Sequence, residues 1–103
     1  MNRNIKQISA IGTIIQLCLE IQNKGMGTAF VEFTGHTGTL FGRFFIPEWK
    51  GGAHAEYAFQ VQFDQKHYEP EKAIMLITNL QDVIYTGVFP KDFNHVSGTV
   101  SAG

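Results

Sequence analysis

The stretch VEFTGHTGTLFGRFF, from Val31 to Phe45, decides the fold because it holds two strand patterns and the short loop between them. Aromatic and β-branched residues, which favour strands, dominate on both sides of the loop Thr34-Gly35-His36-Thr37-Gly38. The loop is too short for a crossover helix, so the strands it joins are antiparallel. We therefore predict a hairpin with strands over Thr28–Thr34 and Thr39–Ile46.

The loop itself has some features of a binding site, because glycines flank His36 and its threonines as in a phosphate-cradling loop. Such loops work by pointing backbone N–H groups at the anion ahead of a helix N-terminus. Here a strand follows the loop, and no lysine closes it. The context favours a hairpin loop whose glycines supply positive φ angles over a phosphate site.

A third strand is expected from Ala55 to Asp64, where the chain alternates most regularly. One face would carry Ala55, Tyr57, Phe59, Val61 and Phe63, and the other Glu56, Ala58, Gln60, Gln62 and Asp64. Such alternation is typical of a strand with one face on the core and one in water. The preceding connection, Pro47 to His54, contains proline and paired glycines, which disfavour both strand and helix.

A first helix is predicted from about Asn4 to Asn23, before the hairpin. Its apolar stripe covers more of the circumference than the ~100° of an ordinary surface helix. The stripe comprises Ile5, Ile8, Ile11, Ile15, Cys18, Leu19 and Gln22, widened by Ile14 and Ile21. We expect a helix buried deeply against the sheet; the alternative is that its fringe, Leu17 and Ile21, contacts a second subunit.

A second helix is predicted from about Pro70 to Ile84, ended by Gly87. Its stripe comprises Ala73, Ile74, Ile77, Leu80 and Ile84. The order α-β-β-β-α predicts an α+β fold in two layers, with both helices on one face of a three-stranded meander. The 103 residues make a single domain, in which Val88–Phe93 packs on the domain and the last residues fray.

Composition reduces the number of functional classes that fit the sequence. The net charge is −1, and the eight Lys and Arg residues form no cluster, which argues against a nucleic-acid binder. The single cysteine, Cys18, cannot form an intramolecular disulfide, which fits a reducing cytoplasm. Polar residues interrupt the longest apolar stretch, from Ile8 to Ile21, so it is unsuited to span a membrane. No signal peptide is visible, and we expect a cytoplasmic protein.

Catalytic and metal chemistry find little support in the sequence. No pair among the four histidines has the spacing of a metal site; they are His36, His54, His67 and His95. Cys18 lies on the apolar stripe of the first helix, where a thiolate is disfavoured. Neither Ser97 nor Ser101 lies in a strand-turn-helix elbow. We therefore expect no cofactor, no metal ion and no catalytic activity.

The second strand remains as the candidate surface, because it is apolar on both faces. Phe41, Arg43 and Phe45 alternate with Leu40, Gly42, Phe44 and Ile46, so one set must point away from the helices. Exposed aromatic and arginine side chains are common at protein interfaces. The predicted partner-binding residues are Phe41, Arg43, Phe45, Trp49 and His36. A different partner protein, a homodimer and a covering C-terminal segment all remain open as explanations of this face.

The chain also resembles small accessory proteins of bacteriophages and prophages. The resemblance is carried by a helix, then FVEFTGHTGTL from Phe30 to Leu40, the loop residue Trp49, an alternating strand and an acidic-proline helix start. It departs from that pattern at Thr34, where the relatives have serine, and at Glu48, where they have glycine. The resemblance implies a protein that binds and inhibits a host or defence protein, such as a CRISPR or nucleotide-signalling effector. The alternative function is nucleotide sequestration, with the TGHTG loop and Arg43 as anion contacts.

Overall fold

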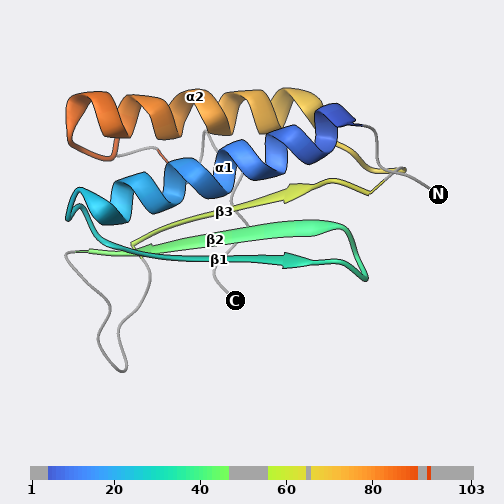
Figure 1. The fold of residues 1–103 in the computed structure, drawn as a ribbon, viewed down its shortest axis with the longest axis horizontal. Coiled ribbons are helices and arrows are strands. Elements are labelled where there is room, and N and C mark those ends of the chain that lie inside the picture. Colours follow the sequence, from blue (N-terminus) through green and yellow to red (C-terminus); the bar gives the residue numbers. More distant parts are fainter. Residues whose placement is uncertain (1–4, 47–55, 65, 91–92, 94–103) are drawn as a thin grey trace.

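The computed structural model describes residues 5–46, 56–64, 66–90 and 93 of the chain, and every structural statement concerns these residues. Its elements are α1 (Ile5–Asn23), β1 (Thr28–Thr34), β2 (Thr39–Phe45), β3 (Tyr57–Gln62) and α2 (Pro70–Thr86). The predicted α-β-β-β-α order is confirmed, and both helices cover the same face of the sheet (Figure 1). Neither described helix combines the length and apolar character needed to cross a bilayer.

The sheet is the predicted antiparallel meander, with β2 between β1 and β3. Its first hairpin turns through residues 35–38, so that Thr34 pairs with Thr39. The N–H of Gly38 donates to the carbonyl of Thr34 at 2.8 Å, and Gly38 has a φ of +69°. A glycine suits this position because a left-handed backbone is costly for residues with a Cβ. The TGHTG stretch is therefore a hairpin tip, as predicted.

The core lies between the sheet and the two helices, which also contact each other. From α1 it receives Ile14, Leu17, Cys18 and Ile21, whereas Ile8 is 55% exposed and Leu19 is 50% exposed. The predicted stripe was therefore wrong at Ile8, Leu19 and Gln22, which are exposed, and the supposed subunit-contacting fringe belongs to the core. The reason is tertiary: α1 packs against α2 as well as β1, which turns its buried face away from Ile8 and Leu19.

Helix α2 buries the positions Ala73, Leu76, Leu80 and Val83. Ile74, predicted to be in the stripe, is 64% exposed, because it lies about 100° around the helix from Ala73. The helix begins with Pro70 in its first turn and ends at Gly87, which adopts the left-handed conformation and donates its N–H to Val83 O. Both ends agree with the sequence signals for helix termini.

The chain after α2 completes the core with aromatic rings. Phe93 is fully buried, and its ring lies 6.2 Å from that of Phe44 and 5.7 Å from that of Tyr57, centroid to centroid. Phe89 stacks on Tyr57 with centroids 4.4 Å apart and planes 8° from parallel. Val88, by contrast, is exposed. The predicted packing of Val88–Phe93 holds for its two phenylalanines; the predicted fraying of the last residues lies outside the described chain.

Candidate functional site: the outer face of the sheet

The alternation of β2 assigns its side chains to the two faces of the sheet. Leu40 and Phe44 are fully buried beneath the helices, so Phe41, Arg43 and Phe45 point to the opposite side. Directly paired residues share a face, which extends this assignment to β1 and β3. We call this the outer sheet face; its residues are Thr28, Phe30, Glu32, Thr34, Thr39, Phe41, Arg43, Phe45, Ala58, Gln60 and Gln62.

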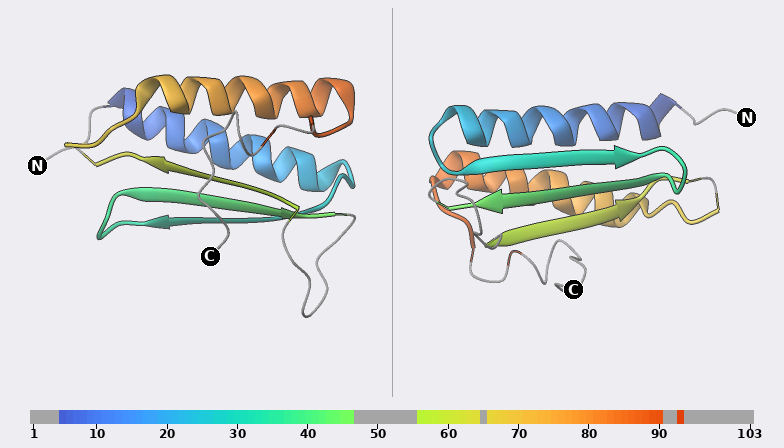
Figure 2. Two further views of the ribbon diagram at one scale, coloured as in Figure 1. Left: turned by 180° about the vertical axis from the view of Figure 1, so that it is seen from behind. Right: turned by 90° about the horizontal axis from the view of Figure 1, so that it is seen from below.

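No described helix or strand covers the outer sheet face (Figures 1 and 2). Its middle row runs from Phe30 through Arg43 to Ala58, and the next row contains Glu32, Phe41 and Gln60. Arg43 is exposed at the centre and forms no ion pair with another described residue. The arrangement is an arginine among aromatic rings, with one carboxylate and one amide beside it.

Phe45 has a supporting role on this face and contributes little exposed surface. Its side chain is 6% exposed, and its ring makes an edge-to-face contact with Phe30, with centroids 5.2 Å apart and planes at 63°. Phe30 is 39% exposed, and its ring packs against that of Phe45. The sequence interpretation named Phe45 and omitted Phe30. The hairpin register contained the missing signal, because pairing Thr34 with Thr39 places Phe30 opposite Arg43.

Of the other two predicted site residues, His36 is described and lies apart from this centre. His36 is exposed in the hairpin turn, and Trp49 lies outside the described residues. From Thr39, which follows the turn, to Arg43 the strand advances four residues, or about 13 Å. The TGHTG turn and Arg43, which the nucleotide alternative names as its anion contacts, therefore lie well apart along β2.

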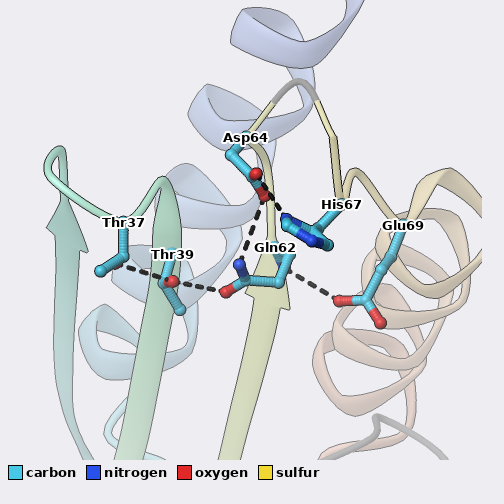
Figure 3. Close-up of polar contacts among 6 residues, drawn as sticks. All are labelled: Thr37, Thr39, Gln62, Asp64, His67 and Glu69. Atoms are coloured by element: carbon cyan, nitrogen blue, oxygen red, sulfur yellow. Dashed lines mark hydrogen bonds and ion pairs between the residues drawn. The ribbon is translucent and has the colours of Figure 1, made fainter.

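A chain of polar contacts joins the hairpin tip to the segment between β3 and α2 (Figure 3). Thr37 Oγ1 donates to Thr39 Oγ1 at 2.9 Å, and Thr39 Oγ1 donates in turn to Gln62 Oε1. The amide of Gln62 donates to Asp64 Oδ1 at 3.3 Å. His67 Nδ1 lies 2.7 Å from Asp64 Oδ2. Sequence reasoning missed these polar contacts, because the residues that make them come from separate segments.

The same polar chain fixes the start of α2. Glu69 Oε1 accepts the N–H of Gln62 at 3.0 Å, and the N–H of Glu69 donates to the Gln62 carbonyl at 3.2 Å. The hydrogen bond between His67 and Asp64 lowers the pKa of the Asp64 carboxyl, and the charge of a protonated His67 acts in the same direction. These contacts connect the end of β3 to the residues that precede α2.

The Asp64–His67 pair resembles the orienting half of an acid–base site, in which a carboxylate holds a histidine by Nδ1. A nucleophile held by the histidine would complete such a site. The hydroxyl of Thr39 donates to Gln62 instead. Burial raises the pKa of the Cys18 thiol to about 12, which disfavours the reactive thiolate. Within the described ranges no three His, Cys, Asp or Glu residues gather closely enough to hold a metal ion.

Comparison with known protein families, with curated proteins and with solved structures gives no match to this chain. The functional interpretation therefore depends on the chemistry of the surface itself. The outer sheet face combines exposure, aromatic rings and an arginine, whereas the polar chain near the hairpin tip joins two parts of the fold.

Proposed function

We propose that this protein is a non-catalytic binding protein whose outer sheet face docks another protein. The observation that carries the proposal is Arg43, exposed between Phe41 and Phe45 on β2 and paired across the sheet with Phe30. Aromatic and arginine side chains are enriched among the residues that dominate binding energy at interfaces. In this arrangement Phe30 and Arg43 are the principal contacts, with Phe41 beside them.

The make-up of the face fits a protein partner. An arginine keeps its charge at any physiological pH and forms two parallel hydrogen bonds with a carboxylate. The adjacent rings supply apolar area around it, while Glu32 and Gln60 place polar groups alongside Phe41. We infer a partner surface with a carboxylate set among apolar side chains. Following the resemblance to phage accessory proteins, the partner is a host or defence protein in the cytoplasm, which binding inhibits.

Affinity capture from a bacterial host lysate tests the proposal. The baits are the full native chain, two variants substituted on the outer sheet face and one control variant substituted on α2. Arg43→Glu reverses the central charge at an exposed position, and Phe30→Ala removes the exposed ring. Tyr85→Ala is the matched control, because Tyr85 is 91% exposed on α2, on the helix side of the sheet. A partner bound through the outer sheet face is retained by the native chain and by Tyr85→Ala, and lost by the other two baits.

The Kd of the purified partner for each variant then measures how much each substituted side chain contributes to binding. Loss of a dominant interface side chain weakens binding by roughly 2 kcal/mol, or about 30-fold in Kd. We expect losses of this order for Arg43→Glu and Phe30→Ala, and an unchanged Kd for Tyr85→Ala. Inhibition is measured as the partner's own activity with and without the chain. A partner that binds all four forms equally would place the interface elsewhere and contradict the proposal.

A nucleotide ligand is the second candidate, favoured by the same arginine between aromatic residues. Aromatic rings stack on bases, and an arginine contacts phosphate. The site would then comprise Phe30, Phe41 and Arg43 without the TGHTG turn. A thermal-shift screen against nucleotides separates the two candidates. A stabilisation that Arg43→Ala abolishes would favour the nucleotide and displace the protein partner as the ligand of this face.

A further inference from the structure

The outer sheet face carries one positive and one negative side chain, Arg43 and Glu32, and its other members are uncharged. Both side chains are exposed, and neither forms an ion pair with another described residue. Each lies beside an aromatic ring, because Arg43 pairs across the hairpin with Phe30, and Glu32 pairs with Phe41. The face therefore presents two opposite charges that no described part of the chain neutralises.

The register of the hairpin places these four residues at the corners of a rectangle. We call them the β1–β2 quartet: Phe30 and Glu32 lie on β1, and Phe41 and Arg43 lie on β2. Residues that are diagonal to each other in such a ladder are about 7–8 Å apart. The two phenylalanines occupy one diagonal, and the two charged residues occupy the other.

This arrangement makes the quartet complementary to a second copy of itself. A two-fold axis that lies along the phenylalanine diagonal, between two sheets packed face to face, exchanges the two ends of the charged diagonal. Arg43 of each copy then lies opposite Glu32 of the other, and each phenylalanine lies opposite its own counterpart. An isologous interface requires the same patch to match itself in this way. A patch with charges of a single sign would instead place like charges opposite each other.

We propose that the outer sheet face binds the same face of a second copy of this chain through the β1–β2 quartet. The inference deepens the proposed function and rests on it in one respect: the second copy covers the docking face until the partner protein displaces it. The charge complementarity of the quartet with itself is the observation that favours this occupant.

The small size of the face predicts a weak dimer. Three strands of six or seven residues give a patch of roughly 350 Å² on each copy, whereas a standard interface buries about 800 Å² on each partner. A protein that buries more surface, including the outer sheet face, can therefore displace the second copy.

Sedimentation velocity at chain concentrations up to about 1 mM tests the dimer, because a weak interface is populated only at high concentration. We expect the native chain to change from monomer towards dimer as concentration rises. Arg43→Glu and Glu32→Arg each place like charges opposite each other, so each variant should associate at least 30-fold more weakly, roughly. Asp82→Arg is the control, because Asp82 is exposed on α2, on the helix side of the sheet, and this variant should associate like the native chain.

Mixing the two outer-face variants tests the arrangement. Both charged positions are negative in Arg43→Glu and positive in Glu32→Arg, so a dimer with one chain of each has opposite charges at both contacts. We expect the equimolar mixture to form this dimer at concentrations where each variant alone is monomeric. A native chain that is monomeric throughout the range, an Arg43→Glu variant that associates like the native chain, or a mixture that stays monomeric would each overturn the proposal.

Addition of the purified partner separates this inference from the proposed function. The dimer should convert to a complex that contains one copy of this chain, and a complex that keeps the two copies together would overturn the displacement. Capture of no partner would contradict the proposed function alone, because sedimentation of the chain by itself measures the dimer.

Discussion

Gly38 in the β1–β2 turn lies directly against Asp64, which follows β3. A Cβ atom added at Gly38 would be 2.8 Å from the Cβ of Asp64 and 2.9 Å from its backbone nitrogen. The carbonyl of Gly38 accepts the N–H of Phe63 at 2.6 Å, so the contact is also hydrogen bonded. The hairpin tip is thereby fixed to the end of β3 through backbone atoms, beside the polar chain from Thr37 to His67.

We predict that Gly38→Ala lowers the free energy of unfolding by about 2–4 kcal/mol. The added Cβ both strains the left-handed backbone and overlaps the backbone of Asp64, and each effect costs roughly 1–3 kcal/mol. Urea denaturation measures the change. Gly35→Ala is the matched control in the same turn, because a Cβ there meets nothing within 4 Å, and it should lose almost nothing. Equal losses in the two variants would show that the contact with Asp64 is unimportant.

The Asp64–His67 pair predicts a dependence of stability on acid pH. Because contact with His67 lowers the pKa of Asp64 in the folded chain, the ionised carboxylate favours folding above its unfolded pKa of about 4. This contribution disappears as pH falls through the lower folded value. Carbon-13 titration of the carboxyl groups should therefore show Asp64 below the ordinary range and its pKa rising in His67→Ala. An unchanged Asp64 pKa in that variant would rule out His67 as the cause.

The meander was predictable because its signals are local. The loop between Thr34 and Thr39 is too short for any connection other than a hairpin, and the alternation from Tyr57 to Phe63 assigns the faces of β3. The helix ends were similarly encoded in the residues at Pro70 and Gly87. Each of these features depends on a few consecutive residues, so tertiary packing had little opportunity to change it.

The buried faces of the helices could not be read from the sequence, because both helices have more apolar residues than the core can cover. Ile8, Leu19 and Ile74 fit the helical period as well as the residues that are buried. Which part of an apolar arc is covered depends on the neighbouring helix and strand. The candidate site was predictable only in part, for the same reason. Alternation along β2 was enough to identify Arg43. The contact between Phe30 and Phe45 depends on how β1 pairs with β2, which a single strand does not show.

The reactivity of the Cys18 thiol reports unfolding of the core and needs no mutation. It is fully buried, and its thiol pKa is raised to about 12, so we predict negligible reaction with an aromatic disulfide reagent at pH 8 in the folded protein. Reaction should become rapid in urea, at the transition seen by circular dichroism. Above about pH 8.5 the unfolded thiol ionises first, so stability should decline towards pH 12. Rapid labelling under native conditions would contradict this burial.

Phe93 predicts that the segment after α2 is part of the cooperative fold. Its ring is fully buried against Phe44, Tyr57 and Phe89, and replacing a buried phenylalanine with alanine costs about 3–5 kcal/mol. Phe93→Ala should therefore lose a large part of the stability of a domain this small, measured by urea denaturation.

Val88→Ala is the control for Phe93→Ala in the same segment. Val88 is 64% exposed, so its truncation should change the free energy of unfolding by no more than about 0.5 kcal/mol. If Phe93→Ala were as stable as Val88→Ala, the ring would contribute no packing energy, and α2 with the sheet would form the core without it. If Phe93→Ala alone is destabilised, with a single transition, then this segment unfolds together with the sheet that carries Phe44 and Tyr57.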